Sequence, residues 1–408
     1  MLEKIKDSLE MQLNIQYCAC MGLYWMMYCF TLSFANAFLA GMGFGTAMIG
    51  FILALVYLLS LLIQQAVSIA VDRGIGLNLT QVITAMSLVL LVSQFCLARS
   101  EGATFRTGFF FLVGAIIVAA MLPFLNALNF HLEKCNVRMN YGVARGTGSA
   151  LFFVGSLMIG KFMEDVSPKA APILSVIFTI IFLLVFGILL FNTRKFKLNE
   201  EIPFDPTRDE TVGLDMSQVV AFYHRFRMFF ILLLGIVGYY FGHMLICNFF
   251  YQIIVNVGGN TADNGGIMAI QAIVEVPCMF LFNKLADRFG TSKLLAVSGI
   301  MYTVKIFFTF IAHSVGMLYF SVLFQSVSFA LFIPASVKFV NEIMDEKDAV
   351  KGQAFVTVAM TGANLLASIF GGILFGTIGC GPTLFLGTIV SIAGCVVAIY
   401  ALIKINEK

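Results

Sequence analysis

The sequence predicts an all-α polytopic membrane protein with twelve transmembrane helices in two halves of six. Of its 408 residues, 60% are hydrophobic and only 12% are charged, whereas about a quarter of the residues in a soluble protein are charged. Apolar runs recur almost from end to end, each close to the roughly 20 residues that cross a bilayer. The only long polar stretch, 193–227, divides these runs into six and six. We therefore expect an N-terminal half, 1–192, and a C-terminal half, 228–408, joined by a linker loop at 193–227.

The predicted spans follow one another with short connections. The polar stretch before the first span lacks the layout of a cleaved signal peptide, so the first span is expected to remain in the membrane. The expected spans are 17–40, 46–70, 80–98, 107–129, 141–163, 170–192, 228–254, 265–284, 292–312, 315–340, 352–376 and 382–404.

The lysine and arginine residues predict the orientation of the spans. Cytoplasmic loops of membrane proteins carry an excess of both residues. Nineteen of the 25 lie on the side of the two termini and the central loop, four lie on the opposite side, and two, Arg145 and Lys305, fall inside spans. We therefore expect a multi-pass protein of the inner or plasma membrane with both termini in the cytoplasm.

The two halves share a short motif. The second span of the first half ends in Asp72-Arg73, and the second span of the second half ends in Asp287-Arg288, about one half-length further along the chain. Two such halves, each built from nested inverted repeats, are typical of secondary transporters.

These Asp-Arg pairs are similar to the loop motif of the major facilitator superfamily. Further stretches resemble the lactose permease-like and nucleoside:proton symporter-like branches of that superfamily. The stretches are Asn14–Tyr17, Gly22–Trp25, Ile49–Leu53, Gln64-Gln65, Tyr141–Ser149, Val274–Pro277 and Gln325–Phe332. The resemblance covers nearly the whole chain, and it implies the major facilitator fold and alternating access.

Glu275 is the one acidic residue that falls deep inside a predicted span. A charge at that depth costs at least roughly 2.5–3.5 kcal/mol and is by default a functional-site hypothesis. Glu275 and Lys305 lie at comparable depths on neighbouring spans, so a structural ion pair is one interpretation. The other is a carboxylate that carries protons or binds substrate, which is the role that the resemblance implies for the matching acid. Lys305 could be a coupling partner or only a neutralising one.

Arg145 lies near the start of the fifth span. It could be a positive-inside residue whose side chain reaches the headgroups. Ser149 and Phe152 follow at four and seven residues, so the three share one helix face. A guanidinium, a hydroxyl and an aromatic plane suit a polyol, a nucleoside or a planar anion. The resemblance implies that the matching arginine binds substrate and that an aromatic at the place of Phe152 stacks on a sugar or base.

Other polar residues inside spans complete the candidate site. His243 could be a core hydrogen-bonding group or a proton relay, and Gln271 lies one turn before Glu275 on the same face. The remaining substrate-binding candidates are Asn129, Tyr240, Asn248 and Gln325.

The sequence also departs from the lactose permease pattern. Asn129 stands where the resemblance places an acid on the fourth span, and the tenth span has no membrane-embedded His or Glu. The only tryptophan, Trp25, is on the first span rather than the fifth. The fifth-span residues are closer to the nucleoside permease pattern.

We therefore expect proton-coupled uptake of a small hydroxylated solute, a sugar, an oligosaccharide or a nucleoside, by a monomer. The alternatives are uptake of a planar organic anion such as an aromatic acid, drug/proton export, and a receptor-like protein that transports nothing. The sequence carries no Walker A, zinc-protease or serine-hydrolase motif, so we expect neither an enzyme nor a bound cofactor or metal. The expected partners are the lipid bilayer, a small-molecule substrate and protons, whose gradient would drive transport; nucleic acid is not expected.

Overall fold

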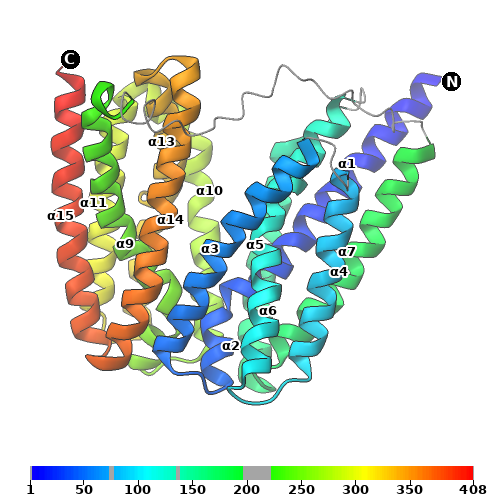
Figure 1. Ribbon diagram of the computed structural model, residues 1–408, viewed down its shortest axis with the longest axis horizontal. Coiled ribbons are helices and arrows are strands. Elements are labelled where there is room, and N and C mark those ends of the chain that lie inside the picture. The colour runs from blue at the N-terminus through cyan, green and yellow to red at the C-terminus, as the bar shows by residue number, and fades with distance from the viewer. Residues whose placement is uncertain (1, 73–77, 135–137, 196–221, 408) are drawn as a thin grey trace. The chain divides into compact units, whose positions relative to one another are not determined.

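The computed structural model describes residues 2–72, 78–134, 138–195 and 222–407 (Figure 1). Within these ranges every long regular element is a helix. Eleven of these described helices are long and apolar enough to cross a membrane, and one bent helix pair near the N-terminus brings the number to twelve. The predicted all-α fold with twelve spans is confirmed.

The helices fall into two compact units, which are described separately. Unit 1 holds the described residues of Met1–Phe44 and Leu55–Pro206, and unit 2 those of Gly45–Ala54 and Thr207–Lys408. The helices from α1 to α7 are α1 (Leu2–Tyr28), η1 (Cys29–Ser33), α2 (Ala35–Gly41), α3 (Thr46–Asp72), α4 (Leu79–Ala98), α5 (Phe105–Lys134), α6 (Tyr141–Asp165) and α7 (Ala170–Lys195). The first residues of α3, up to Ala54, belong to unit 2.

The other helices of unit 2 follow the long central segment. They are α9 (Arg227–Asn256), α10 (Thr261–Phe289), α11 (Thr291–Phe310), α12 (Val315–Leu323), η3 (Phe324–Ser326), α13 (Phe329–Ile343), α14 (Glu346–Thr377) and α15 (Cys380–Asn406).

Two spans that the sequence predicts as continuous helices change helix type along their length. The first changes from α-helix to π-helix at Cys29–Ser33 and then bends by 45° into α2. The tenth passes through the short 3-10 helix η3. In contrast, α10 runs unbroken through Pro277, although proline removes one helical hydrogen bond. The π-helical and 3-10 turns of the first and tenth spans are of types that are frequent at functional sites.

Glycines bring helices of unit 2 into backbone contact. A Cβ on Gly238 of α9 would lie 2.6 Å from the Cα of Gly394 on α15, and one on Gly235 would lie 2.5 Å from the backbone nitrogen of Ala398. Small residues allow this close approach, which is a common basis of helix association in lipid. The helices α9 and α15 therefore pack directly against each other along this segment.

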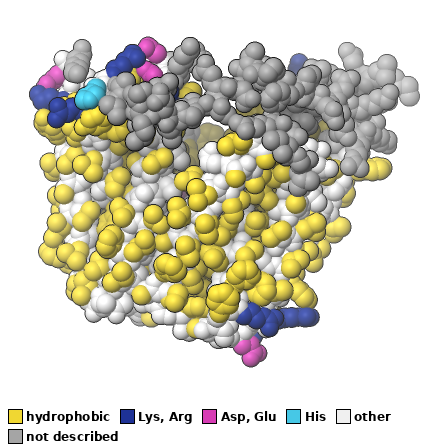
Figure 2. Space-filling view, in the orientation of Figure 1, with side chains coloured by type: hydrophobic (Ala, Val, Ile, Leu, Met, Phe, Trp, Pro, Cys, Tyr) yellow, Lys and Arg dark blue, Asp and Glu magenta, His cyan; other side chains and the backbone are white. Residues whose placement is uncertain are grey.

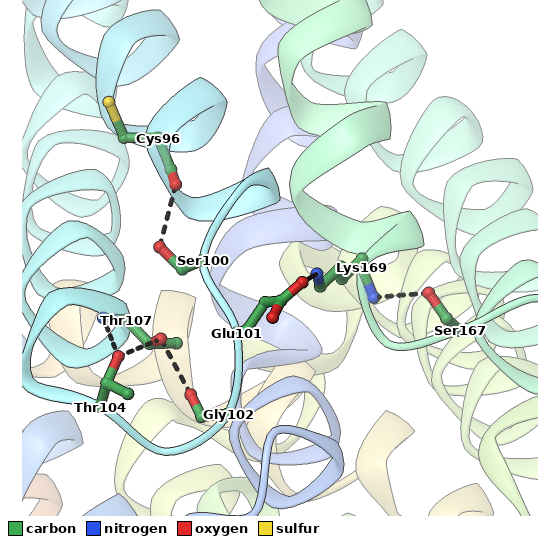
Figure 3. A network of polar contacts seen from close by, with 8 residues as sticks. All are labelled: Cys96, Ser100, Glu101, Gly102, Thr104, Thr107, Ser167 and Lys169. Carbon is green, nitrogen blue, oxygen red and sulfur yellow. Dashed lines mark hydrogen bonds and ion pairs between the residues drawn. The ribbon is translucent and has the colours of Figure 1, made fainter.

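Buried hydrogen bonds fix the helices of unit 1. The hydroxyls of Tyr17 and Tyr24 on α1 donate to the carbonyls of Leu125 and Val118 on α5, at 3.1 and 3.0 Å. At the helix ends, the ion pair of Lys169 with Glu101 joins the loop after α4 to the segment before α7 (Figure 3). These contacts hold α1 against α5 and connect two loops at one end of the unit.

The surface has the pattern of a membrane protein. Figure 2 shows hydrophobic side chains across the middle of the drawn face and the described charged side chains towards its edges. Large apolar side chains point outward from the spans, as with Phe280 on α10, which is 84% exposed. Such exposure is expected for helix faces that meet lipid.

Candidate functional site

In unit 2, a chain of hydrogen bonds joins three polar side chains from three elements. Nζ of Lys305 on α11 donates to Oε1 of Gln325 at 2.6 Å. Nε2 of Gln325 in turn donates to Oε1 of Glu275 on α10 at 2.9 Å. Lys305 and Gln325 are 1% and 2% exposed, whereas Glu275 is partly buried, so the lysine end of this hydrogen-bonded chain lies inside the helix bundle. A cation and a carboxylate are thus connected through one neutral amide.

The break in the tenth span is the local feature that accompanies Gln325. Gln325 is the middle residue of η3, where the helix tightens between α12 and α13. One turn along α11 from Lys305, the Thr309 hydroxyl donates to Ser321 on α12 at 3.2 Å. Polar side chains therefore line the contact of α11 with the tenth span over at least two positions.

His243 lies in a mainly aromatic environment on α9. Its ring centroid is 4.9 Å from that of Tyr302, 5.4 Å from that of Tyr240 and 5.7 Å from that of Phe329. The Cys247 sulfur is 3.7 Å from His243 Nε2, and His243 is 3% exposed. The hydroxyl of Tyr302 is buried and has no hydrogen-bond partner among the described residues. His243 and Tyr240 thus belong to one cluster of rings.

The remaining candidates of unit 2 are Asn248 and Gln271. Asn248 donates to Asn364 Oδ1 at 2.8 Å and to Ser368 Oγ at 2.9 Å, both on α14. It lies next to Phe249, where α9 has non-helical backbone angles. Gln271 is partly buried on α10, one turn before Glu275. Asn248 therefore contributes to the contact of α9 with α14.

In unit 1, Arg145 is placed over the indole ring of Trp25. Its Cζ lies 4.3 Å from the ring centroid, and its Nη1 lies 3.4 Å from Ser149 Oγ. Phe152 packs edge-on against the same indole at 6.2 Å between ring centroids. The predicted face of Arg145, Ser149 and Phe152 therefore exists, and α1 adds Trp25 to it.

Asn129 lies on α5 of the same unit and is 1% exposed. Its amide nitrogen donates to Glu133 Oε1 at 3.1 Å. Its amide oxygen is buried and has no hydrogen-bond partner among the described residues. An acceptor in this state is available to a donor from a ligand or a water molecule.

The two loop motifs are described to different extents. Arg73 lies outside the described residues, as does the side chain of Asp72 at the end of α3. In the second half, Asp287 pairs with Lys338 of α13 at 3.4 Å. The Arg288 guanidinium lies 5.2 Å from the ring centroid of its neighbour Phe289. Asp287 therefore connects α10 to α13.

Sequence reasoning missed Trp25 as part of the site. The sequence indicated Trp25 only as part of the resembling stretch Gly22–Trp25 and as a tryptophan on the first span rather than the fifth. The spacing of Gly22-Leu-Tyr-Trp25 against Gly148-Ser-Ala-Leu151 was the available signal, because three-residue intervals place a small and a large residue on one face of each helix.

Comparisons with known proteins agree with this architecture. The model of the MFS_1 like family matches residues 17–386. The uncharacterized transporter YwbF of Bacillus subtilis (strain 168) is 27% identical over 164 residues, which are 39% of this chain and 41% of that relative.

Two solved structures share the fold at low sequence identity. The nucleoside transporter NupG has a TM-score of 0.73 at 16% identity, covering 98% of this chain and 99% of that chain. A D-xylose-proton symporter has a TM-score of 0.64 at 14% identity, covering 94% and 96%.

Proposed function

The chain belongs to the MFS_1 like family of transporters, and on this premise we propose proton-coupled uptake of a small hydroxylated solute, a sugar or a nucleoside. Transport would follow the alternating access of secondary transporters built from repeated halves. The nucleoside and D-xylose specificities named for the two solved structures support this solute class.

The hydrogen-bonded chain of Lys305, Gln325 and Glu275 carries the proposal. A carboxylate joined to a buried lysine through one amide can bind a proton and become neutral. The amide can stay hydrogen-bonded to it in both protonation states. Embedded acids of this kind mark proton relays in pumps and transporters. Glu275 therefore carries the coupled proton, Lys305 and Gln325 set its surroundings, and His243 is a second candidate for the relay.

The cluster of Arg145, Ser149 and Phe152 supports the choice of solute. A guanidinium and a hydroxyl bind oxygen atoms, and an aromatic ring packs on the flat face of a sugar or base. Gln271, Asn129, Tyr240, Asn248 and Gln325 are the further polar candidates for contacts to the solute.

The setting of the proposal is a bilayer. The excess of lysine and arginine on one side supports a cell membrane location with both termini cytoplasmic. We propose a functional monomer that uses the proton gradient and no bound cofactor.

Uptake into proteoliposomes tests the proposal. The protein is given uridine, D-xylose or benzoate, with and without an imposed pH gradient that is acidic outside. We expect uridine or D-xylose to accumulate only with the gradient. Glu275→Gln removes the titratable group, so accumulation falls to the gradient-free level while exchange of labelled solute persists.

Glu342→Gln is the matched control. Glu342 lies on α13 of the same unit, outside the hydrogen-bonded chain, and contacts Thr291. This variant should accumulate solute like the wild type. Full accumulation by Glu275→Gln would refute proton coupling through this residue.

A planar organic anion is the second candidate, favoured by the guanidinium stacked over Trp25. Benzoate would then be the transported probe and Arg145 would bind its carboxylate. Arg145→Lys loses bidentate geometry, so benzoate affinity should fall at least about tenfold. An unchanged benzoate affinity in Arg145→Lys would rule out this role.

A further inference from the structure

The helices α1 and α6 of unit 1 interlock through two reciprocal pairs of residues. On α6, Gly148 leaves room for Trp25, because a Cβ there would lie 2.9 Å from the indole Nε1 and 3.3 Å from Cγ. On α1, Gly22 leaves room for Leu151, whose Cγ would lie 3.2 Å from an added Cβ. Each helix thus offers a glycine and, three residues later, a large side chain. These contacts therefore limit where the indole ring of Trp25 can lie against α6.

The same ring carries the Arg145 guanidinium on one face. The distance of 4.3 Å from Cζ to the ring centroid is within the range of a cation–π contact. Tyr24 and Tyr28 pack on the indole with centroid distances of 5.5 and 5.3 Å. A ring held in this way limits the positions that the guanidinium above it can take.

The indole N–H indicates what Trp25 contributes. This buried donor has no hydrogen-bond partner among the described residues. A residue that only filled the space could be phenylalanine, which would remove the unsatisfied donor. Tryptophan has the strongest attraction for a cation among the aromatic side chains, so the contact with Arg145 explains its presence at this position.

We propose that Trp25, seated against Gly148, is a positioning residue that aims the Arg145 guanidinium at two neighbouring oxygens of the substrate, as in a cis-diol or a carboxylate. With one face against the indole, the guanidinium presents its N–H donors in a single plane, beside the Ser149 hydroxyl. Planar donors match paired oxygens. This inference rests on the proposed function, since it requires that Arg145 binds the solute.

The first experiment needs no ligand, because Trp25 is the only tryptophan. Its fluorescence is excited selectively over tyrosine in purified, ligand-free protein. Arg145→Gln and Gly148→Ala should each shift the emission spectrum, the first by removing the cation and the second by displacing the ring. Gly146→Ala is the matched control on the same helix, because a Cβ there has nothing within 4 Å. Emission that is unchanged in Arg145→Gln overturns the stacked arrangement.

The second experiment measures binding of uridine, D-xylose and benzoate by calorimetry. For the probe that binds the wild type, Gly148→Ala should weaken binding about ten- to a hundredfold, as expected for a misplaced contact, and Gly146→Ala less than about twofold. Trp25→Phe, which leaves the helices packed, should weaken binding about three- to fivefold because phenylalanine attracts the cation less.

A double variant separates positioning from a purely structural role. Trp25→Phe with Gly148→Ala makes room for the added methyl group, so the thermal stability should recover while the affinity returns only to the level of Trp25→Phe, about three- to fivefold below that of the wild type. Recovery of both would show that Trp25 only fills space and overturns the proposal. If none of the three probes binds the wild type, the proposed function and the role of Trp25 in substrate binding are both refuted. The emission spectra of the ligand-free protein then still test whether Arg145 contacts Trp25.

Discussion

Nζ of Lys305 lies 2.6 Å from Oε1 of Gln325, deep inside unit 2. The opposite end of the same amide donates to Glu275. An amide has one accepting and one donating end, so its orientation is set by a cation on one side and an acceptor on the other. Any change of charge at Glu275 therefore acts on Lys305 through one shared group.

Gln325→Leu tests the importance of this amide. Leaving a buried hydrogen-bonding group without its partner costs roughly 1–3 kcal/mol, and more for a charged group, and the variant removes the acceptor that Lys305 uses. We expect a clear drop in melting temperature in detergent. Adding Lys305→Met to this variant removes the buried charge and should restore most of the stability. If Gln325→Leu alone melts like the wild type, the amide does not stabilise the lysine.

Asn248→Ala distinguishes a packing role from a substrate role. Asn248 bonds to Asn364 and Ser368 across the contact of α9 with α14. Interhelical bonds in membranes average about 0.6 kcal/mol and reach about 1.7. We expect a stability loss in that range, measured by chemical denaturation in detergent, and a packing role alone predicts an unchanged solute affinity. Weaker solute binding at unchanged stability would instead support the direct contact that the sequence suggests.

Gly238→Ala tests the backbone contact of α9 with α15. The added methyl group would meet Gly394 Cα at 2.6 Å, and overpacking of this kind typically costs about 1–3 kcal/mol. The melting temperature should fall.

Gly362→Ala is its control in the same unit, because a Cβ there has nothing within 4 Å. Replacing a glycine inside a helix by alanine stabilises it by roughly 0.5–1 kcal/mol, so the melting temperature should rise or stay constant. A fall of equal size in both variants would contradict the packing argument.

The spans could be predicted because membrane helices are long and apolar. The central polar loop and the recurring runs were sufficient to place all twelve. The π-helix at Cys29–Ser33 could not be predicted, since no proline or glycine marks it. The turn of 3-10 helix at Phe324–Ser326 is equally unmarked. Both breaks depend on packing against other helices.

The residue types of the candidate site could be predicted from the sequence, but the contacts between their side chains could not. Embedded charges are rare enough to single out Glu275, Lys305 and Arg145. Depth along the helices suggested that Glu275 and Lys305 lie close, and the structure adds Gln325 between them. The register of the tenth span against α10 and α11 sets that arrangement. Trp25 escaped prediction because its contact with Arg145 exists only when α1 packs on α6.

The glycine contacts of α9 also have a mechanical consequence. From Gly235 to Gly242, α9 lies so close to α15 that a Cβ on any of these glycines would meet atoms of α15, so we expect this stretch and α15 to move together. Beyond it lies Phe249, where the backbone angles leave the helical range and the ring stacks on Phe375 of α14. We therefore expect Phe249 to be the hinge of α9, at which bending within unit 2 is concentrated.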